Sequence, residues 1–72
     1  MSDLQKNIIR FLQDNKGHWF YVSQIRNNLN EEGNTNFHSS INALVRRGLI
    51  IKRVMGKYFQ FTISDSETFS FS

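Results

Sequence analysis

The hydrophobic pattern of this chain changes period at Gly48, and this change constrains the fold more than any other feature of the sequence. Before Gly48, apolar residues recur every three or four positions, which is typical of amphipathic helices. After it, residues 58–63 (YFQFTI) alternate apolar and polar side chains, which is typical of a half-buried strand. The sequence therefore predicts an α+β fold, in which helices pack against a C-terminal β-hairpin.

The first helix is expected over residues 3–15. Ser2 and Gln5 have the spacing of a capping box, in which each side chain binds the backbone N–H of the other residue. Gly17 is placed to end the segment, because glycine tolerates the left-handed conformation that follows many helices. The run WFYV at 19–22 is rich in strand-forming residues and predicts one short strand.

Two further helices are expected on either side of a turn at residues 31–34. The second helix is short, covers 23–30 and has Ser23 as its N-cap. The third covers 35–47, is capped by Asn34 or Thr35, and ends at Gly48. Its apolar stripe predicts which side of the helix faces the core.

The hairpin is expected to pair residues 49–54 with 58–63 across a turn at 55–57, in one of two registers. A two-residue turn would place Lys52 opposite Phe59, whereas a longer, bulged turn would pair Arg53 with Phe59 and Ile51 with Phe61. The second register is favoured because it keeps Leu49 and Ile51 on the buried face with Phe59, Phe61 and Ile63. Tyr58, Gln60 and Thr62 are then expected to face solvent.

The length and composition allow one small domain. At 72 residues the chain is near the lower limit for independent folding, and it has no cysteine for a disulfide or a thiolate zinc site. Seven Phe, two Tyr and one Trp supply large apolar side chains for the core. Residues 1–63 are expected to form the domain, and 64–72 a flexible tail. No signal peptide or membrane-spanning segment is recognised, so a cytoplasmic protein is expected.

The charges are distributed unevenly along the chain. Residues 33–64 carry five Lys or Arg and no acid, so this stretch has a charge of +5, while the remainder has −2. A field of one sign confined to one part of a small fold favours a polyanionic partner. The alternative is that these cations form an ordinary solvated surface.

Two short motifs, one at the end and one at the start of an expected helix, resemble those of a known family. LVRRGLI at 44–50 is similar to the end of the recognition helix in winged helix-turn-helix proteins, and VSQI at 22–25 is similar to the start of the helix before the turn. The resemblance covers about residues 4–63. It implies a winged helix of three helices, a short strand and a hairpin wing. It also implies binding of double-stranded DNA and transcription regulation, and a homodimer would supply the two half-sites that specificity usually needs.

The residues of the expected DNA surface come from the third helix and the wing. On the outer side of the helix, the candidates for base contacts are Asn36, Ser39, Ser40 and Asn42, with Thr35 beside them. The candidates for phosphate contacts are Arg46, Arg47, Lys52, Arg53 and Lys57, with Tyr58 beside the wing turn. Gln24 and Arg26 are weaker candidates for backbone contacts.

Enzymatic chemistry is not expected. The two histidines, His18 and His38, have no carboxylate at metal-ligand spacing, and neither a Gly-rich phosphate loop nor a nucleophile with its partners is recognised. No cofactor or small-molecule ligand is therefore expected. Two alternatives remain for the aromatic run at 19–21. It could stack single-stranded bases, or it could, like the tail, dock another protein in a winged-helix interaction module without DNA binding.

Overall fold

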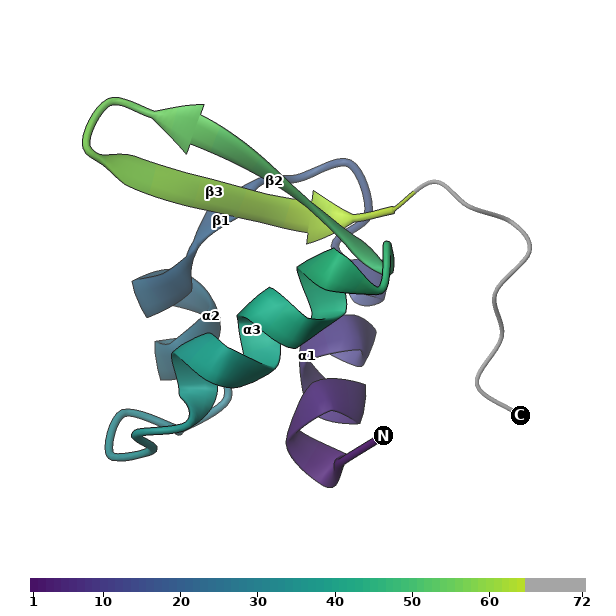
Figure 1. The fold of residues 1–72 in the computed structure, drawn as a ribbon, viewed down its shortest axis with the longest axis vertical. Coiled ribbons are helices and arrows are strands. Elements are labelled where there is room, and N and C mark those ends of the chain that lie inside the picture. Colours follow the sequence, from purple (N-terminus) through teal and green to yellow (C-terminus); the bar gives the residue numbers. More distant parts are fainter. Residues whose placement is uncertain (65–72) are drawn as a thin grey trace.

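The computed structural model describes residues 1–64 and has the predicted α+β architecture, with three helices and a three-stranded antiparallel sheet. The elements are α1 (Asp3–Asp14), β1 (Phe20–Tyr21), α2 (Val22–Asn28), α3 (Phe37–Arg46), β2 (Ile50–Met55) and β3 (Tyr58–Ile63). The helices lie on one side of the sheet, in which β3 is the central strand (Figure 1). Beyond Ser64, the predicted tail lies outside the described residues.

Helix α1 begins with the predicted capping box. The Ser2 hydroxyl accepts from the Gln5 N–H at 3.2 Å, and the Gln5 side chain accepts from the Ser2 N–H at 3.1 Å. The helix ends one residue earlier than predicted, and the Asn15 side chain donates to the carbonyl of Phe11 at 2.8 Å. These bonds satisfy backbone groups that have no partner inside the helix.

Strand β1 and helix α2 differ from their predicted bounds. Only Phe20 and Tyr21 pair with β3, so the strand has two residues where three or four were expected. Helix α2 then starts at once, with Tyr21 rather than Ser23 at the N-cap. The Gln24 side chain accepts from the Tyr21 N–H at 2.9 Å and so supports the junction of strand and helix. The chain therefore passes from sheet to helix without a loop.

Helix α3 starts two residues later and ends one residue earlier than predicted. Its N-cap is Asn36, and the Asn34 side chain accepts from the Asn36 N–H at 2.8 Å to form the turn before the helix. The predicted glycine, Gly48, follows the C-cap residue Arg47 and terminates the helix. Gly48 has a φ of 76°, and the N–H groups of Gly48 and Leu49 donate to Val45 and Leu44. This is the Schellman arrangement, which requires a left-handed residue after the helix.

The core lies between the helices and one face of the sheet. Its members are apolar side chains from α1, α2, α3, β2 and β3, all at most 4% exposed: Ile8, Ile9, Leu12, Ile25, Phe37, Ile41, Leu44, Ile50, Phe61 and Ile63. Phe20 adds a ring at the edge, 4.9 Å from the ring of Phe11. The sheet is therefore held to the helices mainly at the end of the hairpin distant from its turn.

Both expected hairpin registers are wrong. Strand β2 continues to Met55, which pairs with Tyr58, so the turn holds only Gly56 and Lys57. Gly56 has a φ of 63°, as the first position of a type II′ turn requires. The two-residue turn was thus a correct option, but it lies one residue later than assumed and places Lys52 opposite Phe61.

The register also decides which side chains face the helices. Ile50 is 2% exposed, whereas Ile51, which was expected inside, is 42% exposed. Phe59 shares the helix-facing side with Phe61 as predicted, but it is 45% exposed because it lies near the turn, beyond the core. Thr62 was expected to face solvent and is 6% exposed, with its hydroxyl donating to the carbonyl of His18 at 2.8 Å.

The buried bond of Thr62 gives a stability prediction. We expect Thr62→Val to lower the free energy of unfolding by about 1–2 kcal/mol, because it leaves the His18 carbonyl without this donor. Thr62→Ser, which keeps the hydroxyl, should retain more of the stability. Urea denaturation followed by circular dichroism measures both variants. A loss in Thr62→Ser with none in Thr62→Val would mean that the methyl group, not the hydrogen bond, is what matters at this position.

Candidate functional site

The exposed side of α3 carries small polar and basic side chains. His38, Ser39, Asn42 and Arg46 are exposed, while Ser40 is half-buried. His38, Asn42 and Arg46 are four residues apart, so they follow one another along one side of the helix. Thr35 and Asn36 are exposed in the turn that leads into the helix rather than in the helix itself. The predicted base-contacting residues therefore lie together at the solvent side of α3 and its N-terminal turn.

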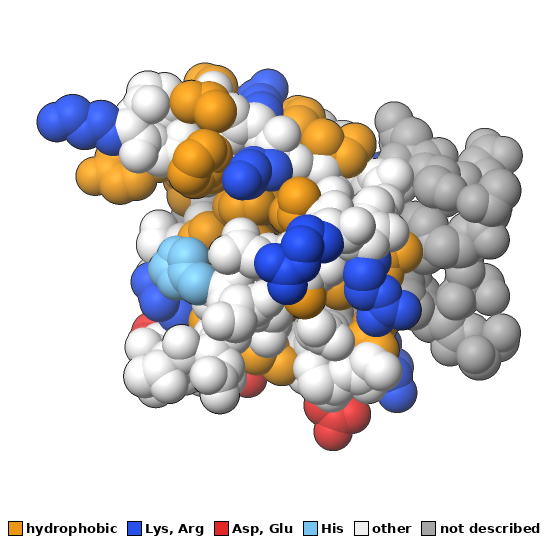
Figure 2. All heavy atoms as spheres, in the orientation of Figure 1, with side chains coloured by type: hydrophobic (Ala, Val, Ile, Leu, Met, Phe, Trp, Pro, Cys, Tyr) orange, Lys and Arg blue, Asp and Glu red, His pale blue; other side chains and the backbone are white. Residues whose placement is uncertain are grey.

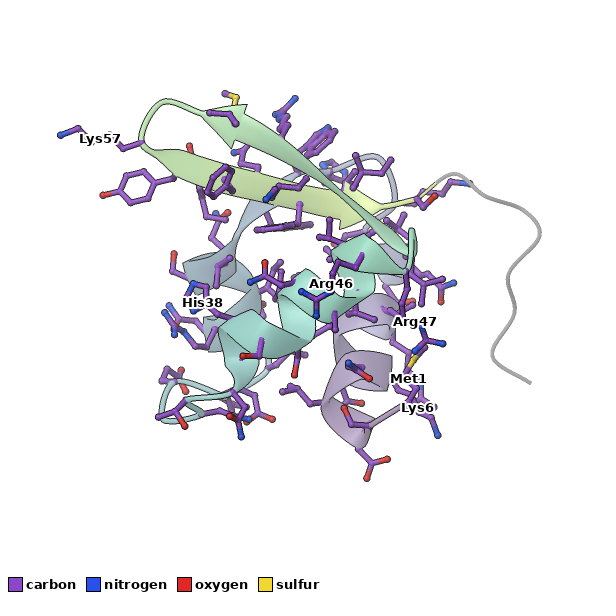
Figure 3. All side chains as sticks on the ribbon, in the orientation of Figure 1. Met1, Lys6, His38, Arg46, Arg47 and Lys57 are labelled. Atoms are coloured by element: carbon purple, nitrogen blue, oxygen red, sulfur yellow. The ribbon has the colours of Figure 1, made fainter. Side chains whose placement is uncertain are left out.

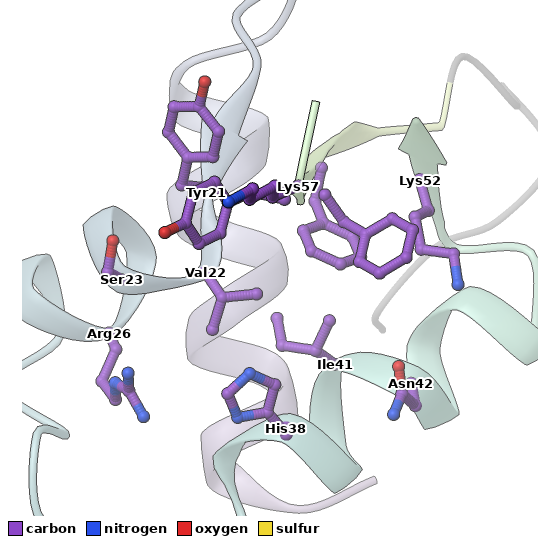
Figure 4. Close-up of a pocket in the computed structure, with 12 residues that line it drawn as sticks. Tyr21, Val22, Ser23, Arg26, His38, Ile41, Asn42, Lys52 and Lys57 are labelled. Atoms are coloured by element: carbon purple, nitrogen blue, oxygen red, sulfur yellow. The ribbon is translucent and has the colours of Figure 1, made fainter. Parts of the chain in front are cut away.

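Lys52 extends this polar surface from α3 to the hairpin. It is opposite Phe61 on the helix-facing side of the sheet, and its Nζ lies 4.6 Å from the centroid of the Phe59 ring. Together with Asn42 it lines a groove between the hairpin and the helices (Figure 4). Lys57 occupies the turn at the outer end of the hairpin, and Arg46 lies on the visible side of α3 (Figure 3).

Arg53 is separated from this group, although the sequence grouped it with Lys57. It pairs with Gln60 on the face of the sheet opposite to Lys52. Its guanidinium lies 4.2 Å from the centroid of the Trp19 ring and donates twice to the Gln60 side chain, at 2.9 and 2.7 Å. Arg53 therefore braces the segment before β1 against the sheet.

The remaining predicted residues lie at the borders of this surface. Arg47 is the C-cap of α3 and is exposed at the end opposite to the hairpin turn (Figure 3). Tyr58 is 68% exposed, and its ring meets that of Tyr21 edge-on at 6.1 Å. Gln24, a weak candidate, is used in the strand–helix junction.

Two residues that the sequence did not place among the main candidates also belong to this surface. Arg26 from α2 and His38 from α3 both line the groove (Figure 4). The Arg26 guanidinium lies 5.9 Å from the centroid of the Phe37 ring, so its stem is held beside the core. The helical spacing of His38 and Asn42 was the available sequence signal, whereas the position of Arg26 depends on how α2 packs.

Charge is uneven over this face of the molecule. Figure 2 shows Lys and Arg side chains across α3 and the hairpin, with acidic side chains only in the lower part of the view. None of the twelve residues that line the groove is acidic. Within residues 1–64, no cluster of His, Asp and Glu that could hold a metal ion is present. The described helices are all too short or too polar to cross a membrane.

The comparisons with known proteins give no relative. No protein-family model, curated protein or solved structure matches the chain. The chemistry of this face therefore has to be argued from its own residues.

Proposed function

We propose that this chain is a winged helix-turn-helix domain that binds double-stranded DNA, with α3 in the major groove and the β2–β3 hairpin as the wing. The observation that carries the proposal is a group of cations beside the exposed polar side of α3. Arg26 and Lys52 line the groove with Asn42, and none of the groove residues is acidic. Arg46 is exposed and follows Asn42 by about one helical turn on the same side of α3. An α-helix fits the major groove of B-DNA, and Lys and Arg beside it neutralise phosphates.

The roles differ between the two halves of the surface. Asn36, Ser39 and Asn42 are short polar side chains that can bond base edges without holding the helix away from the groove. Arg46, Lys52 and Lys57 are the proposed phosphate contacts, which fix position and supply affinity. Arg53 is not part of this set, because it lies on the other face of the sheet. A role in transcription regulation, as a homodimer on two half-sites, follows from the same proposal.

The proposal is tested by selecting bound sequences from a random duplex pool and then titrating salt on the enriched duplex. We expect the logarithm of the binding constant to fall with the logarithm of salt concentration, by about 0.9 per phosphate contacted. Ser39→Ala and Asn42→Ala should change which sequences are enriched, because these residues contact bases. Failure to bind any duplex at low salt would refute the proposal and favour a protein-interaction module.

A further inference from the structure

The groove between the wing and the helices has two kinds of lining. It has a volume of about 730 Å³, and it is bounded by α2, α3 and the helix-facing side of the hairpin (Figure 4). Apolar side chains form part of it, from Val22, Ile41, Phe59 and Phe61. Basic side chains come from Arg26, Lys52 and Lys57. A ligand that matches the whole groove must bring both apolar groups and negative charge.

The phosphates of a DNA backbone would match only the basic part of this lining. Phosphates would neutralise the lysines, but they offer nothing to cover Phe59, which is 45% exposed, or the adjacent Val54, which is 68% exposed. Covering exposed apolar surface is favourable in water by about 25 cal/mol per Å². The groove therefore favours an occupant that carries aromatic or aliphatic side chains together with carboxylates.

The segment that follows β3 has this composition. Residues 65–72 read DSETFSFS, with two acids, two phenylalanines and no Lys or Arg. In an extended chain, alternate side chains point to the same side, so Phe69 and Phe71 would share one side. The two acids precede the two phenylalanines in the sequence, so they are closer along the chain to the end of β3.

The described chain ends within reach of the groove. The Ser64 N–H donates to the carbonyl of Leu49 at 3.1 Å, which fixes the start of the segment beside the first residues of β2. Lys52 follows Leu49 by three residues, a distance of about 10 Å along a strand. Eight extended residues span at most about 26–29 Å. The segment can therefore pass Arg46 and Lys52 and enter the groove of its own molecule.

We infer that residues 65–72 dock in this groove of their own molecule. Asp65 and Glu67 face Arg46 and Lys52, and the two phenylalanines cover the apolar lining near Phe59 and Phe61. The docked segment occupies cations that the proposed DNA contact also needs. Docking would thus compete with DNA, and DNA affinity would reflect the fraction of molecules in which the groove is open. The docking itself does not depend on the proposed function.

A spin label tests the docking in the full chain without DNA. The chain has no cysteine, so Ser72→Cys gives a single attachment site. With the label oxidised, we expect loss of amide signal intensity at His38, Asn42 and Phe59, and little loss at Asn7 on α1. Adding Asp65→Asn, Glu67→Gln, Phe69→Ser and Phe71→Ser should restore the signals, since these changes remove the charges and rings that bind.

Three outcomes would overturn the inference. The first is intensity at the groove amides that does not change with the label. The second is a loss that persists in the four-substitution variant, which would mean that contact is random. The third is an equal loss in a mixture of two proteins, one that carries the spin label without nitrogen-15 and one that carries nitrogen-15 without the spin label. That result would mean that the docked segment comes from a second copy. DNA binding by the same variant is a separate measurement: affinity should rise severalfold if both proposals hold, and should be absent if only the docking does.

Discussion

Phe37→Ala is expected to leave a large part of the chain unfolded at 25 °C. Phe37 is fully buried at the start of α3 and is the largest of the fully buried side chains. Truncation of a buried Phe to Ala costs about 3–5 kcal/mol. A core in a chain this short supplies about 3–5 kcal/mol in total. One substitution can therefore consume the whole free energy of unfolding.

The control for this prediction is the same substitution at an exposed ring. Phe59→Ala removes a side chain that is 45% exposed and packs on Lys52 rather than in the core, so a much smaller loss is expected. Phe37→Leu, which keeps most of the volume, should retain a cooperative transition at lower denaturant concentration. Urea denaturation monitored by circular dichroism compares the three variants. Similar midpoints for Phe37→Ala and Phe59→Ala would contradict the assigned core.

The parts of the fold that the sequence predicted are those set by neighbouring residues. The capping box of Ser2 and Gln5 and the helix end at Gly48 depend on bonds within a few residues, so their patterns are visible in the sequence. Likewise, the apolar spacing of α3 identified its outer side, where Ser39, Asn42 and Arg46 are exposed. Local patterns thus predicted the elements and the polar face of α3.

The hairpin register was not predictable from the same patterns. The stretch LIIKRV at 49–54 has no clear alternation, so nothing in it indicates which residues face the core. The extension of β2 by Met55 moved every pair by at least one position. The side of the sheet on which a cation lies depends on that position, so Lys52 joined α3 while Arg53 stacked on Trp19.

Contacts between distant segments account for the other corrections. Thr62 alternates as an outward residue, but the chain at His18, 44 positions away, covers it and accepts its hydroxyl. The Trp19–Arg53 contact also joins residues far apart in the sequence. A periodicity analysis treats each strand alone and cannot include a segment that crosses over it. The place of Arg26 in the groove, which the sequence offered only as a weaker candidate for backbone contacts, has the same origin, because it depends on the packing of α2.

The largest expected effect on DNA binding comes from three substitutions that remove a positive charge from the proposed DNA side: Arg46→Gln, Lys52→Gln and Lys57→Gln. Each lost phosphate contact lowers the steepness of the salt dependence by about 0.9, so the three together lower it by roughly 3. With that slope, one phosphate contact makes the binding constant about tenfold larger at 0.1 M salt than at 1 M salt. The triple variant should therefore bind about 100- to 1,000-fold more weakly at 0.1 M salt, on every sequence alike.

A matched triple variant separates the assigned face from net charge. Lys6→Gln, Arg10→Gln and Lys16→Gln remove the same charge from exposed positions on or just after α1. Because these residues are not in the proposed contact set, only the small loss from weaker long-range attraction is expected. Arg53→Gln, on the other face of the sheet, should likewise leave the salt slope unchanged. Fluorescence anisotropy on one duplex across a salt series measures the affinity and the salt slope of the two triple variants and of Arg53→Gln. Equal loss of affinity and slope in both triple variants would mean that binding follows net charge, and that α3 and the wing do not form the contact face.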